Sequence, residues 1–166
     1  FGETNLLKNY GEIFLRFREG TYAASDRVGQ KSPEFSHKWG EHRFSSNQLK
    51  GQNCLLLFLD ERGEFCKQAL QIAESVSLQE NLTPVILYIE KQPENIENRS
   101  GAIILEYTGK TAGEYGVTGY PTLFLLDPEG TIRFVKIGYS PLLAEELELA
   151  VRQILHDRPI QAQKNK

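Results

Sequence analysis

The feature that most constrains the fold is a pair of short, continuously apolar segments, CLLLFL (54–59) and PVILYI (84–89). Runs of this length are typical of strands that are buried on both faces of a sheet. Residues 65–78, between the two runs, carry apolar side chains at helical spacing, at Ala69, Ile72, Ala73 and Val76. That spacing predicts an amphipathic helix. Strand, helix and strand in this order predict two parallel strands joined by a crossover helix.

The rest of the chain predicts further strands and helices around this unit. Residues 122–137 form two apolar segments around Asp-Pro-Glu-Gly, which indicates a β-hairpin. Residues 101–117 predict a short strand or turn, then a short helix around residues 110–115 that Gly116 ends. Ser140 and Pro141 predict the start of a last helix, whose apolar stripe is Leu143, Leu147, Ala150, Val151 and Ile154. The expected fold class is α/β, with a mixed sheet covered by helices.

Four segments precede this core. Residues 5–18 carry apolar side chains at helical spacing, at Leu6, Tyr10, Ile13, Phe14 and Phe17. We interpret them as a helix packed on the domain or as a helix that follows a membrane anchor. Residues 19–35 are interpreted as a linker, residues 35–44 as a short hairpin with Gly40 near its turn, and residues 45–52 as a turn or helical loop. We therefore expect an amphipathic helix and linker over 1–27, one domain over 28–157 and a polar tail over 158–166.

Length, charge and composition exclude several classes of protein. A chain of 166 residues suits one domain, and its net charge of −3 gives no basic surface for nucleic acid. No apolar run approaches the ~20 residues that span a bilayer. Two cysteines make no disulfide framework, and no Cys and His cluster has zinc-type spacing, so we expect no metal or cofactor. The chain lacks Met, so we expect a processed piece whose removed part was a signal peptide, a membrane anchor or a tag.

The segment GVTGYPTLFLLDPEG (116–130), together with the order of elements, resembles the thioredoxin fold. The similarity is greatest to the redoxin branch, the TlpA-like and peroxiredoxin-like proteins, whose G-x-x-x-P-x-F entry segment is found here at residues 29–35. LKGQNCLLLFL resembles the L-K-G-K that leads into the first core strand of that branch. The passage LLLFLDERGEFCKQALQIAESVS also resembles the membrane-anchored thioredoxin-like accessory proteins of methylamine utilisation. The resemblance covers residues 28–156 and implies a thioredoxin-like mixed sheet between helices, with an N-terminal helical extension.

In this family a C-x-x-C motif begins the helix after the first core strand, and here the same place reads Gly63-Glu64-Phe65-Cys66. The resemblance assigns Gly63 to the first cysteine position and Cys66 to the second, and Lys67 agrees with the basic residue that commonly follows. The first thiol attacks a substrate disulfide and the second resolves the mixed disulfide. The attacking thiol is therefore the one that is missing, and we expect a degenerate site.

Cys66 remains the candidate catalytic residue of this degenerate site. The family keeps the second thiol recessed, and a buried thiol has a raised pKa and reacts slowly. Gly63 leaves an open place at the helix start that could admit an anion or a substrate group. Leu57 stands where thioredoxins carry a buried acid, and Glu90 at the end of the next strand is a weak substitute.

The resemblance also implies a partner-binding edge at Thr118, Tyr120 and Pro121. It implies a cis Tyr120–Pro121 bond that faces Cys66 and offers backbone groups to an extended protein or peptide partner. The alternative is a trans proline at the start of an edge strand. The redoxin branch further implies an extracytoplasmic location, periplasmic or membrane-anchored, with a membrane tether in the full-length precursor.

These observations leave two main functions open. The first is an accessory or binding module without dithiol reductase activity, and the second is a thiol-disulfide oxidoreductase that uses Cys66 alone. A peroxidase is a weaker alternative, because Leu59 and Gly63 occupy its Pro and Thr positions, although Arg62 is close.

The remaining cysteine and the histidines are interpreted as structural. A strand over residues 54–59 spans about 20 Å, whereas bridged Cα atoms lie within about 7 Å, so no Cys54–Cys66 disulfide is expected. Cys54 is interpreted as a small buried apolar residue. Surface or hairpin roles are expected for His37, His42 and His156, and Trp39 is expected to cover a core edge.

Overall fold

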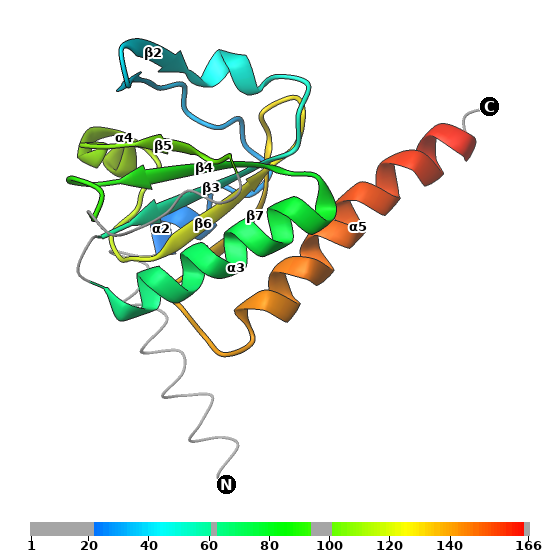
Figure 1. Cartoon of the computed structure of the whole chain (residues 1–166). Helices are drawn as coiled ribbons and strands as arrows, with labels where there is room; N and C mark the ends of the chain where they lie inside the picture. The colour runs from blue at the N-terminus through cyan, green and yellow to red at the C-terminus, as the bar shows by residue number, and fades with distance from the viewer. Residues whose placement is uncertain (1–21, 61–62, 94–100, 165–166) are drawn as a thin grey trace, which may run out of the picture.

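The computed structural model describes residues 22–60, 63–93 and 101–164 (Figure 1). A central sheet has the order β5-β4-β3-β6-β7, in which β3 is parallel to β4 and β4 to β5, while β6 is antiparallel to both β3 and β7. The strands are β3 (Cys54–Leu59), β4 (Thr83–Tyr88), β5 (Ile103–Leu105), β6 (Thr122–Leu126) and β7 (Ile132–Ile137). The predicted mixed sheet is thereby confirmed, with its first core strand at the predicted bounds.

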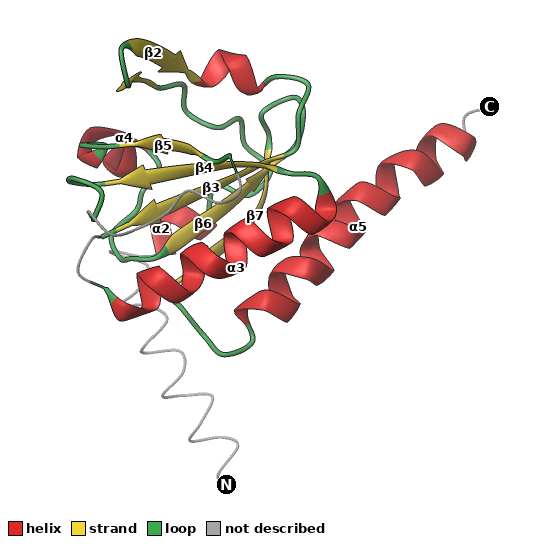
Figure 2. Cartoon of the chain, viewed as in Figure 1, coloured by secondary structure: helices red, strands yellow, loops and turns green. Residues whose placement is uncertain are grey.

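Helices cover both faces of this sheet (Figure 2). Helices α3 (Glu64–Glu80) and α5 (Leu143–Lys164) pack together over one face. The other face is covered by α2 (Tyr22–Ser25), α4 (Gly109–Glu114) and the hairpin of β1 (Ser36–Trp39) and β2 (His42–Ser45), which leads into the 3₁₀ helix η1 (Ser46–Leu49). The crossover helix, the hairpin and the short helices predicted from the sequence are therefore present.

The buried strand β3 divides the core into two halves. Its alternate side chains Leu55, Leu57 and Leu59 face α3 and α5, because successive side chains of a strand point to opposite faces. Cys54, Leu56 and Phe58 face the other half of the core. There the rings of Phe58, Tyr115 and Phe124 pack with centroids 5.1–5.7 Å apart.

Two segments expected to be a linker and a tail contain helix in the structure. Residues 22–25, within the expected linker, form α2, which packs against β7. Ala24 of this helix is fully buried in the core on that face of the sheet. At the other end, α5 begins at Leu143, two residues after Pro141, and continues to Lys164. The predicted polar tail over 158–166 therefore overlaps the helix. Polarity alone does not distinguish an exposed helix from a coil, and Gln, Ala and Lys all favour helix. The predicted helix over 5–18 lies outside the described residues.

The hairpin is held on the domain by its aromatic and histidine side chains. Trp39 meets Phe44 edge-on, with ring centroids 5.9 Å apart, so it covers a core edge as predicted. The Nε2 atom of His37 lies 2.6 Å from the Thr111 hydroxyl, which ties β1 to α4. Burial, and then the Arg43 charge, lower the pKa of His37. His42 is exposed, and the side chain of His156 lies outside the described residues.

Candidate functional site

Cys66 lies in the first turn of α3, beyond the carboxyl end of β3. Only 4% of the residue is exposed. Burial raises the pKa of its thiol, the Asp60 carboxylate raises it further, and a hydrogen bond from the Asp60 backbone opposes both. At neutral pH the sulfur is therefore a recessed thiol rather than a thiolate.

Gly63 caps α3 with an extended backbone and provides no side-chain hydrogen bond. A Cβ atom built on Gly63 would lie 3.0 Å from the Sγ atom of Cys66. Across a disulfide with an S–S bond of ~2.04 Å, the Cβ of one cysteine lies ~3.0 Å from the sulfur of the other. The backbone at residues 63 and 66 therefore has the spacing of a C-x-x-C pair, with glycine at the first of the two positions.

The loop before β6 lies beside this helix start. Its Tyr120–Pro121 bond is cis, and the Pro121 carbonyl accepts a hydrogen bond of 2.8 Å from the Gly138 N–H. Burial raises the pKa of Tyr120, and the nearby Asp60 and Cys66 raise it further. Among the described residues, the backbone N–H and C=O of Tyr120 have no hydrogen-bond partner. These two groups can therefore bind an extended chain as a strand edge does.

The structure brings together most of the residues that the sequence singled out. Gly63, Cys66 and Tyr120 meet at one end of the sheet, and Thr118 is exposed two residues before Tyr120. Leu57 is fully buried. Glu90 is exposed, and its backbone carbonyl accepts the Tyr107 N–H, so its side chain supplies no buried acid.

Sequence reasoning missed two aromatic residues of this site. The ring of Tyr139 stacks on the exposed ring of Phe65, with centroids 5.1 Å apart and an interplanar angle of 9°. Tyr88 ends the strand next to β3, is 2% exposed, and burial raises its pKa to about 12, with smaller contributions from Cys66 and Glu74. The signal for Tyr88 was an aromatic residue with a polar tip at the end of a buried strand. Tyr139 had no signal, because its partner Phe65 is remote in sequence.

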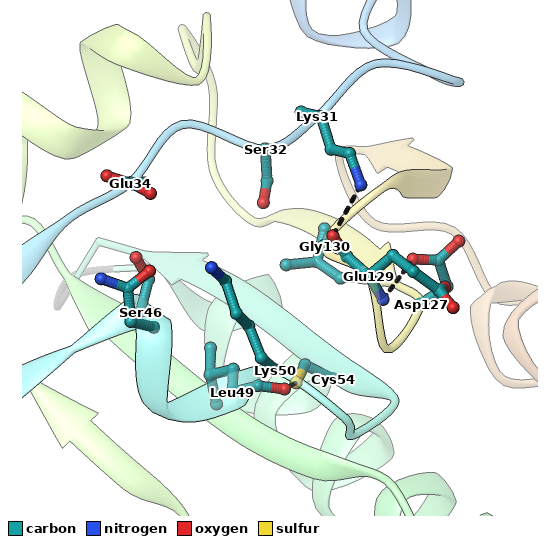
Figure 3. A pocket seen from close by; sticks show the side chains of 12 residues that line it. Lys31, Ser32, Glu34, Ser46, Leu49, Lys50, Cys54, Asp127, Glu129 and Gly130 are labelled. Carbon is teal, nitrogen blue, oxygen red and sulfur yellow. Dashed lines mark hydrogen bonds between the residues drawn. The ribbon is translucent and has the colours of Figure 1, made fainter.

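A hollow of about 240 Å³ lies at the end of the sheet opposite Cys66 (Figure 3). Lys50 extends into it, and the Lys31 ammonium donates a hydrogen bond of 2.9 Å to the Glu129 carbonyl. Cys54 lines this hollow but is 1% exposed, and burial raises its pKa to about 12. It lies about one strand length, ~20 Å, from the Cys66 end. Cys54 is therefore a buried apolar residue, as predicted, and both cysteines are free.

Metal-binding clusters and membrane-spanning helices are absent from the described ranges. Within them, no three His, Cys, Asp or Glu side chains gather closely enough to hold a metal ion. None of the helices in the same ranges combines the length and the apolar character that a membrane span requires.

Neither a protein-family model nor a curated protein matches the sequence. Solved structures do match. A Chlorobium tepidum protein described as a thiol:disulfide interchange protein DsbE has a TM-score of 0.67 at 20% identity, over 75% of this chain and 94% of that one. The exposed lipoprotein thioredoxin of Streptococcus pneumoniae has a TM-score of 0.59 at 18% identity, over 75% of this chain and 99% of that one. The 2-Cys peroxiredoxin of Plasmodium vivax has a TM-score of 0.62 at 18% identity, and the match covers 80% of this chain and 99% of that one. With the sheet order, these likenesses show that the chain has a thioredoxin-like fold.

Proposed function

We propose that this protein is a binding or accessory module that holds an extended partner segment at the Tyr120–Pro121 edge and has no dithiol reductase activity. The observation that carries the proposal is the combination of a missing attacking sulfur at Gly63 and a recessed thiol at Cys66. Disulfide exchange needs an accessible thiolate, whereas the unpaired backbone groups of Tyr120 need only a partner strand.

A second candidate is a one-thiol oxidoreductase that uses Cys66. In its favour, Cys66 begins a helix, where the helix dipole and free N–H groups stabilise a thiolate. Against it, burial dominates and raises the pKa of this thiol. The accessory module is therefore the better supported of the two.

We also infer an extracytoplasmic location. Thioredoxin-fold neighbours of this chain include an exposed lipoprotein and a secreted disulfide oxidoreductase of Mycobacterium tuberculosis. Expressing the protein from its natural gene, fused to a reporter that is active only outside the cytoplasm, tests this inference. If the protein is instead fused to a reporter that is active only in the cytoplasm, activity of that fusion would contradict the inference.

The reactivity of Cys66 distinguishes the two functions. We expect native Cys66 to react with iodoacetamide more slowly at pH 7 than a free thiol, because the raised pKa lowers its thiolate fraction and burial hinders the reagent. The raised pKa also shifts the titration upward, so the rate should still be rising at pH 9. Mass spectrometry separates Cys66 from Cys54, and the unfolded chain is the reference. A rate that reaches its plateau below pH 8 would favour the one-thiol enzyme.

Peptide selection tests the binding edge directly. We expect extended peptides selected from a random phage library to bind the wild-type protein and the Cys66→Ala variant equally, with or without dithiothreitol. Binding should slow amide hydrogen exchange at Tyr120, because the peptide would accept its free N–H. Complexes that require Cys66 and are released by dithiothreitol would indicate mixed disulfides and would overturn the proposal.

A further inference from the structure

The hollow at the end of the sheet opposite Cys66 has walls that belong to the folded framework (Figure 3). Its lining comes from three segments that are far apart in the sequence, namely residues 31–34, 46–54 and 126–130. Backbone hydrogen bonds join these segments. The Ser32 N–H donates to the Gly130 carbonyl at 2.8 Å, and the Gly51 N–H donates to the Pro128 carbonyl at 2.8 Å. The hollow is therefore pre-formed, as small-molecule sites usually are.

The floor of this hollow is apolar. Leu49, Cys54 and Leu126 line it, and at most 6% of each residue is exposed. Water that lies against such side chains is released favourably by an apolar group. The volume of about 240 Å³ equals the share of about eight water molecules in the liquid, at ~30 Å³ each. The space therefore suits a ligand of about eight non-hydrogen atoms with an apolar body.

One wall adds a positive charge. Lys50 extends its side chain into the hollow (Figure 3), and among the described residues its ammonium has no hydrogen-bond or ion-pair partner. Lys31, in contrast, already donates to the Glu129 carbonyl at 2.9 Å. The Ser46 hydroxyl accepts the Phe35 N–H at 3.0 Å, so its own hydrogen is available to a ligand. Lys50 and Ser46 can therefore both donate to one anionic group.

The acidic residues of the hollow limit the charge of that ligand. Asp127 is 5% exposed, and its carboxylate accepts the N–H groups of Glu129 and Thr131 and pairs with Arg133 at 3.5 Å. Its charge is therefore compensated within the turn. Glu34 and Glu129 are exposed side chains of the same lining. They would repel a multiply charged anion such as a phosphate ester, whereas a single carboxylate needs only one cation.

We propose that this hollow binds a small organic acid with one carboxylate and a short apolar body. The carboxylate pairs with the Lys50 ammonium and accepts the Ser46 hydroxyl hydrogen, in charge-assisted contacts. The apolar body lies on Leu49 and Leu126. This inference is independent of the proposed function, because the hollow and the Tyr120 edge lie at opposite ends of β3, about 20 Å apart.

NMR titration of the isotope-labelled full chain with hexanoate tests the proposal. Hexanoate has one carboxylate and an apolar chain of the required size. We expect saturable shifts of the amide signals of residues 46–50 and of Gly130, with a Kd on the order of 1 mM for so small a ligand. Hexanol keeps the chain without the charge, so it should bind about tenfold more weakly. Shifts that cluster at Tyr120 instead would contradict the assignment of the hollow.

Substituting Lys50 tests the proposed anchor of the carboxylate. Lys50→Gln shortens the side chain slightly and removes its charge, so we expect hexanoate to bind about tenfold more weakly. Lys38→Gln is the matched control, because Lys38 is exposed on β1 outside the hollow, and its Kd should be unchanged. The spectrum of each variant without hexanoate shows whether it is folded. Absence of saturable shifts, equal affinity for hexanol, or an unchanged Kd in Lys50→Gln would overturn the inference.

Discussion

Replacing Gly63 with cysteine is expected to create a disulfide between residues 63 and 66 in the oxidised protein. The introduced Cβ would stand 3.0 Å from the Cys66 Sγ, which is the ~3.0 Å spacing that a disulfide requires. The backbone at Gly63 is extended with a negative φ, a conformation that suits any residue, and the Cβ is crowded only by the Cys66 side chain with which it would bond. Thiol titration before and after reduction, with peptide mapping, measures the bond directly.

Under the proposed function the wild type has no disulfide reductase activity, and the same substitution should give the protein one. The introduced thiol stands at the N-terminus of α3, where the helix dipole lowers a thiol pKa, and Cys66 lies in place to resolve the mixed disulfide. Insulin reduction in the presence of dithiothreitol measures this gain. Gly63→Ser places the same Cβ beside Cys66 without the sulfur, so it should form no disulfide and show no activity.

The outcome tests the proposal that the lack of a sulfur at residue 63 prevents disulfide exchange at this site. If Gly63→Cys forms the disulfide and gains activity, one sulfur is enough to supply that chemistry. If the disulfide forms but insulin is not reduced, a further feature, such as Leu57 in the place of a buried acid, also limits the reaction. If no disulfide forms, the close approach of residue 63 to Cys66 is wrong, and the degenerate-site interpretation fails with it.

The parts of the fold that were predicted correctly depend on local patterns. Six consecutive apolar residues over 54–59 can satisfy their backbone groups and bury both faces only inside a sheet, and β3 has those bounds. The turn at Asp127 is equally local, because its carboxylate accepts the N–H groups of Glu129 and Thr131. In contrast, α2 could not be predicted, because the buried position of Ala24 depends on a strand more than a hundred residues later.

The candidate site likewise has residues that the sequence identified and contacts that only the structure showed. Gly63, Cys66 and Pro121 were identified from motifs, because each stands next to a strand whose position the apolar pattern fixes. The burial of Cys66 and the stack of Phe65 on Tyr139 required the structure, since tertiary contacts alone bring α3 and the loop after β7 together. Motif spacing thus indicated where chemistry would occur, while the contacts determine how reactive the thiol is.

The largest effect on stability is expected from Phe124→Ala. Phe124 is fully buried on β6, and its ring meets Tyr115 and Phe58 edge-on at 5.1 and 5.7 Å. Removing the ring leaves a cavity between two aromatic neighbours in the centre of the sheet, so we expect the free energy of unfolding to fall by about 3–5 kcal/mol. Urea denaturation followed by circular dichroism measures this loss. Phe124→Leu fills most of the space and should cost about 1 kcal/mol.

Phe65→Ala is the matched control, because it removes the same ring from an exposed place. Phe65 is 58% exposed and contacts Tyr139 on one face, so its loss should lower the free energy of unfolding by less than about 1 kcal/mol. If the proposed partner segment contacts Phe65, the same variant should also weaken the binding of selected peptides about tenfold, since it removes exposed apolar area beside Cys66. A large loss of stability with unchanged binding would make Phe65 a structural residue and would place it outside the binding surface. The two variants thus separate two roles of a phenylalanine ring, packing inside the core at Phe124 and the proposed contact with a partner at Phe65.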